Sequence, residues 1–103
     1  MLIVITTAPD RALANTLADK LVREKFAACV QILPQMTSVY FWEGEVQRDE
    51  EHLLIIKTSR GKYAEVESVI KANHSYEVPE IVAFESAEVS DRYREWLEGY
   101  VGQ

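Results

Sequence analysis

The stretch HLLIIKT, His52 to Thr58, decides the fold of this chain. Four apolar residues follow one another at its centre, over positions 53–56. A strand with one face in water alternates apolar and polar residues, whereas an uninterrupted apolar run is typical of a strand buried on both faces. We therefore expect this strand to lie inside a sheet, with other strands beside it and a cover on each face.

Other extended segments supply the neighbouring strands. Short apolar runs with β-branched residues, which favour strands, occupy residues 2–7 (LIVITT), 27–33 (AACVQIL) and 80–86 (EIVAFES). Pro34 interrupts the second run, and the extended pattern resumes over 36–46. Because proline cannot donate to a ladder, it should mark a bulge or an edge. Gly44 and the polar tract 47–51 are interpreted as the end of a hairpin.

Three segments carry apolar residues at helical spacing. Leucines recur every fourth residue over 13–21, after Asp10, whose side chain suits a helix start. A second helix is predicted from a cap at Ser59 to an end at residues 73–74. The third follows Ser90 and ends at Gly102, and it shows the clearest amphipathic spacing, over residues 93–101.

The order of these elements is β-α-β-β-α-β-α, and its first six match the split βαβ arrangement. In that arrangement one antiparallel sheet carries both long helices on one face. The final helix and a partner subunit are then the candidates to cover the other face. The predicted fold class is α+β: a ferredoxin-like βαββαβ sandwich with an additional C-terminal helix, in one domain over residues 1–103.

Charge and composition narrow the possible partners. The formal net charge is −6, from 17 acidic and 11 basic residues, and no run of Lys or Arg occurs. Basic patches bind nucleic acid and anionic membranes, so we expect neither partner, whereas an acidic surface is compatible with cations. The opening residues resemble no signal peptide or membrane span, which favours a cytoplasmic protein. The single cysteine, Cys29, is interpreted as a small buried residue of a strand.

No pattern in the sequence indicates catalysis. Neither histidine stands in a nucleophile–base motif, and the glycines form no phosphate-binding loop. The neighbouring acids Glu50 and Glu51 are interpreted as a solvated hairpin tip, not an acid–base pair. Tyr40, Phe41 and Trp42 could stack bases, but the acidic balance favours core and subunit-interface roles. We therefore predict a protein without enzymatic activity.

The segment KANHSYEVPEI, residues 71–81, raises the question of a metal site. His74 is a ligand suited to copper, nickel or zinc, and the carboxylates of Glu77 and Glu80 follow it closely. The alternative is that His74 hydrogen-bonds the end of a helix, which a lone histidine does more often. From the residues alone the structural role is favoured, and His52 is the weaker metal candidate.

Several motifs together resemble the CutA family of divalent-cation tolerance proteins. They are FAACVQILPQMTSVYFWEGEV, EEHLLIIKTS, HSYEVPEIVAF and YREWL, in this order and over nearly the whole chain. The resemblance implies a ferredoxin-like subunit in a homotrimer, linked to copper(II) or another divalent cation as ligand, with no established catalytic activity. The similarity in fold to trimeric signalling proteins implies an alternative: a signalling or scaffold module that binds a small molecule or protein in clefts between subunits.

The resemblance also implies a metal site, although not all of its residues are present. Thr6 stands where a copper-binding family member has a cysteine, and Asn73 stands where that member has the first of two histidines. His74 matches the second histidine, and Glu80 matches the glutamate of the family's P-E-I motif. The expected metal ligands are therefore His74 and Glu80, with carboxylates of a neighbouring subunit to complete the site.

Overall fold

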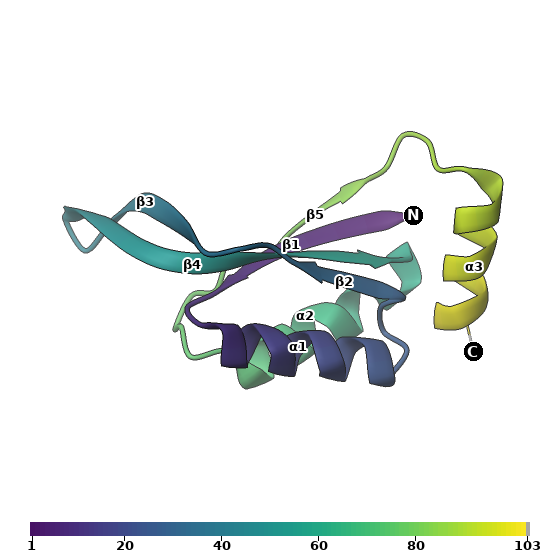
Figure 1. Ribbon diagram of the computed structural model, residues 1–103, viewed down its shortest axis with the longest axis horizontal. Helices are drawn as coiled ribbons and strands as arrows, with labels where there is room; N and C mark the ends of the chain where they lie inside the picture. The colour runs from purple at the N-terminus through teal and green to yellow at the C-terminus, as the bar shows by residue number, and fades with distance from the viewer. Residues whose placement is uncertain (103) are drawn as a thin grey trace.

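The computed structural model describes residues 1–102 as one sheet with helices beside it (Figure 1). The elements are β1 (Leu2–Ala8), α1 (Arg11–Arg23), β2 (Cys29–Ile32), β3 (Met36–Trp42), β4 (Glu45–Thr58), a short 3-10 turn η1 (Arg60–Lys62), α2 (Tyr63–Asn73), β5 (Val82–Glu85) and α3 (Asp91–Val101).

The sheet has the strand order β2-β4-β1-β5, and each pair of neighbours is antiparallel. With β3 left aside, this is the ferredoxin-like βαββαβ arrangement with an added C-terminal helix, as the order of the elements predicted. The stretch 52–58 lies in the middle of the sheet, because β1 pairs with it on one edge and β2 on the other.

Strand β4 is longer than the sequence indicated. The polar tract 47–51, predicted to be the end of a hairpin, belongs to the strand and pairs with β3 residue by residue. The prediction is confirmed at Gly44: the chain reverses at Glu43 and Gly44, whose φ angles of 50° and 82° suit a two-residue hairpin turn. The prediction failed for 47–51 because neither face of this part of β4 is packed on a core, so the tract lacks an apolar period.

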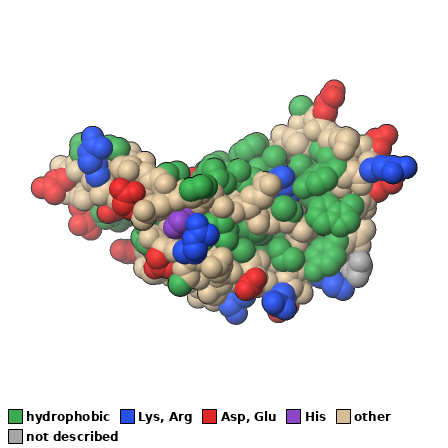
Figure 2. All heavy atoms as spheres, viewed as in Figure 1, with side chains coloured by type: hydrophobic (Ala, Val, Ile, Leu, Met, Phe, Trp, Pro, Cys, Tyr) green, Lys and Arg blue, Asp and Glu red, His purple; other side chains and the backbone are tan. Residues whose placement is uncertain are grey.

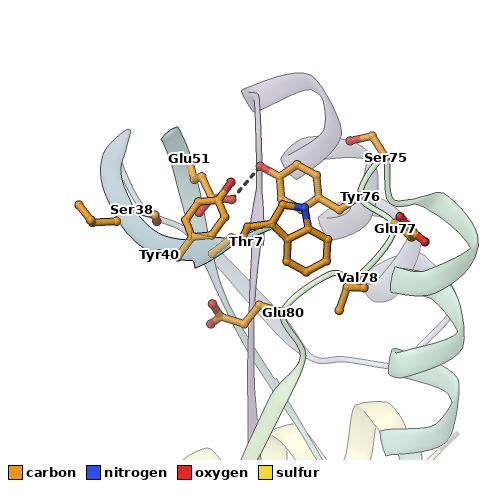
Figure 3. Close-up of a pocket in the computed structure, with 11 residues that line it drawn as sticks. Thr7, Ser38, Tyr40, Glu51, Ser75, Tyr76, Glu77, Val78 and Glu80 are labelled. Carbon is orange, nitrogen blue, oxygen red and sulfur yellow. Dashed lines mark hydrogen bonds between the residues drawn. The ribbon is translucent and has the colours of Figure 1, made fainter. Parts of the chain in front are cut away.

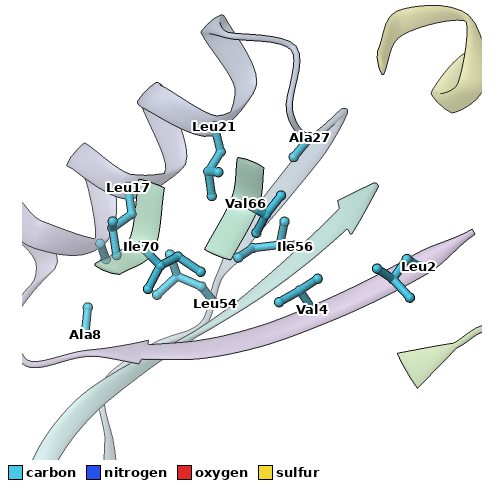
Figure 4. Close-up of a cluster of buried hydrophobic side chains, with 11 residues drawn as sticks. Leu2, Val4, Ala8, Leu17, Leu21, Ala27, Leu54, Ile56, Val66 and Ile70 are labelled. Carbon is cyan, nitrogen blue, oxygen red and sulfur yellow. The ribbon is translucent and has the colours of Figure 1, made fainter. Parts of the chain in front are cut away.

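The helices α1 and α2 lie together on one face of the sheet (Figure 1). The core between helices and sheet consists of buried aliphatic side chains (Figure 4): Leu2, Val4, Ala8, Ala14, Leu17, Leu21, Ala27, Leu54, Ile56, Val66 and Ile70. Asp10 begins α1 as predicted, since its carboxylate accepts a hydrogen bond of 2.8 Å from the Leu13 amide. Ser59 and Ser90 stand at helix starts, but neither makes the predicted side-chain cap bond.

Residues 1–102 of one chain do not completely cover the opposite face of the sheet. Leu54 and Ile56 point to the helices and are fully buried, whereas Leu53 and Ile55 are only half-buried. In Figure 1 α3 lies past one end of the sheet, where Leu97 and Val101 pack with Ala28. The expected burial of β4 on both faces is therefore not reached in the single chain.

Candidate functional site

A groove of about 630 Å³ lies where the β3–β4 hairpin meets the loop 74–81 (Figure 3). Its walls combine three aromatic side chains with three carboxylates: Tyr40, Trp42, Tyr76, Glu51, Glu77 and Glu80. The remaining walls are small or apolar, and no Lys or Arg is among the described residues that line it. Figure 2 shows acidic side chains along the same projecting hairpin. The groove is thus aromatic and negatively charged.

The register of the hairpin brings the groove's side chains onto one face. Ser38 pairs with Asp49, and Tyr40 pairs with Gln47, so alternate residues of both strands point to the same side. On this face the Tyr40 hydroxyl donates a hydrogen bond to the Asp49 carboxylate. Phe41 points to the opposite face and is 71% exposed. The predicted core role of the hairpin aromatics is therefore wrong for the single chain.

The loop opposite the hairpin is held by His74. Its amide closes α2 with a 3.0 Å bond to the Ile70 carbonyl. Its Nε2 lies 2.6 Å from the Thr7 carbonyl, and its Nδ1 accepts a 3.0 Å bond from the Tyr76 amide. A carbonyl can only accept and an amide can only donate, so the ring is the neutral tautomer with its proton on Nε2. Both ring nitrogens are therefore engaged within the chain.

Glu51 links the two sides of the groove. It is 6% exposed, and the Tyr76 hydroxyl donates a 2.8 Å hydrogen bond to its carboxylate (Figure 3). Burial, and then this bond to Glu51, raises the pKa of Tyr76 above its ordinary value. The prediction that Glu51 belongs to a solvated tip is wrong, because the loop covers it. The phenol of Tyr76 stays protonated at neutral pH and serves as a donor.

The predicted metal ligands occupy different settings. Glu80 is exposed and lines the groove, whereas His74 is half-buried and its ring lies tilted against that of Tyr76, with ring centroids 4.7 Å apart. Within residues 1–102, no three His, Cys, Asp or Glu side chains lie together as a potential metal centre.

The positions that depart from the copper-binding family member are filled differently. Thr6 is fully buried and its hydroxyl has no hydrogen-bond partner among the described residues. Asn73 donates a 2.8 Å hydrogen bond from its side-chain amide to the Val69 carbonyl. His52 is buried, with Nδ1 2.9 Å from the Leu33 carbonyl, and Cys29 is half-buried in β2. None of these residues lines the groove.

Sequence reasoning missed the groove itself. Tyr76 was part of a family motif, but its contact with Glu51 joins residues that are 25 positions apart. A pattern of alternation over 45–51 would have placed Glu51 on the same side as the hairpin aromatics, had the tract been read as strand. The contact with the loop had no signal in the sequence.

Among the residues that the structure places, no helix has the length and hydropathy required to cross a bilayer.

Comparison with known proteins gives full-length matches. The family model described as CutA1 divalent ion tolerance protein matches residues 2–99. The divalent-cation tolerance protein CutA of Thermus thermophilus is 44% identical over 100 residues, which cover 97% of this chain and 97% of that protein. The chloroplastic protein CutA of Arabidopsis thaliana is 47% identical over 96 residues, which cover 93% of this chain. The matched residues make up 53%, about half, of the length of that chloroplastic relative.

Solved structures show the same fold. The Thermus thermophilus divalent cation tolerance protein superposes with a TM-score of 0.94 at 44% identity, over 97% of this chain and 98% of that one. A protein from Archaeoglobus fulgidus, named a periplasmic divalent cation tolerance protein CutA, gives a TM-score of 0.94 at 34% identity. That alignment covers 98% of this chain and 99% of the archaeal one.

Proposed function

The chain belongs to the CutA1 family of divalent ion tolerance proteins, and from that premise we propose that it is a divalent-cation tolerance protein. In this proposal the protein is a homotrimer that binds copper(II) or a related divalent cation and contributes to the response to metal ions. The observation that carries it is the match to proteins of this name along nearly the entire chain.

The proposed ligands are His74 and Glu80, with carboxylates of a neighbouring subunit. Glu80 is exposed at a groove whose charged residues are all acidic, which favours a cation there. His74 would have to release either the Thr7 carbonyl or the Tyr76 amide before a ring nitrogen could bind a metal. Because one chain holds no cluster of three suitable ligands among residues 1–102, the proposal requires assembly.

The uncovered face of the sheet supports assembly. Val82 and Phe84 are each 49% exposed on β5, and they share this face with the half-buried Leu53 and Ile55 of β4. Contiguous apolar surface that is exposed on a single chain is typical of interaction sites. Three copies that bury these faces against one another would supply the cover that a single chain lacks.

A copper titration of the metal-free protein by calorimetry tests the metal site. We expect saturable binding that weakens at least about tenfold in His74→Ala and in Glu80→Gln, since each variant loses a ligand. Glu24→Gln, at the exposed end of α1, removes the same charge away from the groove and should leave the affinity unchanged. Equal, weak binding in all four proteins would show that copper binds the acidic surface non-specifically.

A second function, from a different class, rests on the groove itself. In this alternative the protein is a trimeric signalling or scaffold module that binds a small molecule or a protein partner in clefts between subunits. A cavity of about 630 Å³ with three aromatic walls has the size and composition of a small-molecule site. A thermal-shift screen distinguishes the two functions, because stabilisation by metabolites but not by metals would favour the alternative.

Both functions are binding functions without catalysis, and we propose that they are carried out in the cytoplasm. The relative from Archaeoglobus fulgidus is named periplasmic, so the compartment needs its own test. Fractionation of the source cells with marker proteins for each compartment would decide it.

A further inference from the structure

We propose that the groove between the β3–β4 hairpin and the loop 74–81 binds a small organic cation with a methylated ammonium head. This inference rests on the second proposed function, a module that binds a small molecule, and it assigns the chemical class of the ligand. The carboxylates of the groove and its aromatic and apolar walls support this assignment.

The charge of the groove selects a cation. Glu51, Glu77 and Glu80 are its ionisable acids, and it has no basic residue among the described residues that line it. Glu51 is buried and accepts a bond from Tyr76, whereas Glu77 and Glu80 are exposed. The three carboxylates would repel an anion, and no basic residue among the described lining residues would offset this repulsion. A neutral ligand would gain no attraction from their charge.

The aromatic walls select a weakly hydrated cation. In the single chain Tyr40 and Trp42 are 42% and 43% exposed, so part of each residue is open to a ligand. In Figure 3 Tyr40 comes from the hairpin and Tyr76 from the loop, and the Glu80 side chain lies apart from both rings. Cations held over aromatic faces gain attraction from the ring quadrupole, and methylated ammonium groups are the ligands that such aromatic walls recognise.

The composition of the walls favours a methylated over a primary ammonium group. A primary ammonium has three donors, each of which requires an acceptor, whereas a trimethylated ammonium has none and can lie against apolar and aromatic surface. The Tyr40 and Tyr76 hydroxyls donate to Asp49 and Glu51, and these bonds hold both rings at the wall of the groove. Val78 adds apolar surface, which suits methyl groups. The exposed carboxylates then act at the edge of the site as counter-ions.

Calorimetric titration of the assembled protein with choline tests the inference. The comparison ligand is the uncharged isostere of choline in which carbon replaces the nitrogen. Ionic strength is held constant so that electrostatic screening is the same in both titrations. We expect saturable choline binding and an affinity for the isostere at least about tenfold lower. Equal affinities would overturn the inference, because the groove would then recognise shape and apolar surface alone.

Variants locate the binding. Trp42→Leu should weaken choline binding about tenfold, and Glu80→Gln should weaken it several-fold. Tyr40→Phe keeps the ring and should retain most of the affinity. Phe41→Leu, on the opposite face of the hairpin, is the matched control and should change nothing. Circular dichroism of each variant confirms folding, and equal losses in Phe41→Leu and Trp42→Leu would overturn the inference.

The copper titration on the same samples separates this inference from the functions proposed above. Choline binding without copper binding would contradict the metal function and leave this inference standing. Copper binding without choline binding would overturn this inference alone. Stabilisation by another metabolite but not by choline would keep the small-molecule function and reject the ligand class. Absence of choline binding in the assembled protein, with binding in a dissociated variant, would also overturn it, because a second copy would then fill the groove.

Discussion

At the scale of single residues, the His74 side chain connects strand β1 to the loop that follows α2 in the isolated chain. Both ring nitrogens bond the backbone, one to β1 and one to the loop that follows α2. His74→Ala should therefore lower the free energy of unfolding by about 1–3 kcal/mol, because a carbonyl and an amide lose their partners. Urea unfolding measures this loss. Ser75→Ala, at an exposed neighbour, should stay within about 0.5 kcal/mol of the parent, and an equal effect of both substitutions would contradict the prediction.

Tyr76 predicts a dependence of stability on alkaline pH. Burial, and then Glu51, raises the pKa of Tyr76 in the folded state. In the unfolded chain the same phenol titrates at about pH 10. Above that pH the folded state binds more protons than the unfolded state, so stability falls as pH rises. Below it the contribution is fully present. Tyr76→Phe lacks this titration, so its stability should fall less steeply above about pH 10.

The measurement is urea unfolding of both proteins at a series of pH values. At neutral pH the variant should be less stable by about 1–2 kcal/mol, because the buried Glu51 loses a donor. This difference should shrink as the pH passes about 10. A difference that stays constant across the series would contradict the proposed role of the phenol.

The sequence could predict only part of this residue-scale picture. The Asp10 cap and the position of His74 at the end of a helix follow from local patterns, and the structure confirms both. The burial of Glu51 could not be predicted, because it depends on a loop 25 residues away in the chain. The expectation of His74 and Glu80 as metal ligands stays a prediction.

At the scale of elements, replacing a glycine should have opposite effects on stability in a turn and in a helix. Gly44 has a φ of 82° in the hairpin turn, whereas Gly99 lies inside α3 and a Cβ there would meet nothing within 4 Å. Gly44→Ala should cost about 1 kcal/mol, because an L-residue resists that φ. Gly99→Ala should stabilise by about 0.5–1 kcal/mol, because alanine favours the helix. Thermal unfolding checks both, and shifts of the same sign would contradict this account.

Most element types could be predicted from periodicity, and the failure at β4 has a physical cause. Where an element packs against the core, its apolar residues give a signal: a fixed spacing in α1 and an unbroken run in the second half of β4. The hairpin half of β4 packs against no apolar core, so its sequence DEE is as typical of a turn as of a strand. Its strand structure is set by pairing with β3.

At the scale of the whole molecule, the proposed assembly depends on the uncovered face of the sheet. Phe84 is 49% exposed on this face, opposite Ile3 of β1. Phe84→Asp should dissociate the proposed trimer, because a buried interface would have to desolvate an unpaired charge. Sedimentation analysis measures the change in mass. Asn15→Asp adds the same charge on the exposed side of α1 and should leave the assembly intact. An unchanged mass for Phe84→Asp would place the interface elsewhere.

The groove and the core use separate sets of residues, which bears on how this protein can diverge. None of the side chains that line the groove belongs to the aliphatic cluster beneath α1 and α2, and most of them are exposed. Substitutions at the exposed groove residues, such as Trp42, Glu77 and Glu80, can therefore change what is recognised at little cost to folding. Related chains would be expected to keep the core and differ in ligand, so that shared ancestry predicts the shape of such a protein better than it predicts its chemistry.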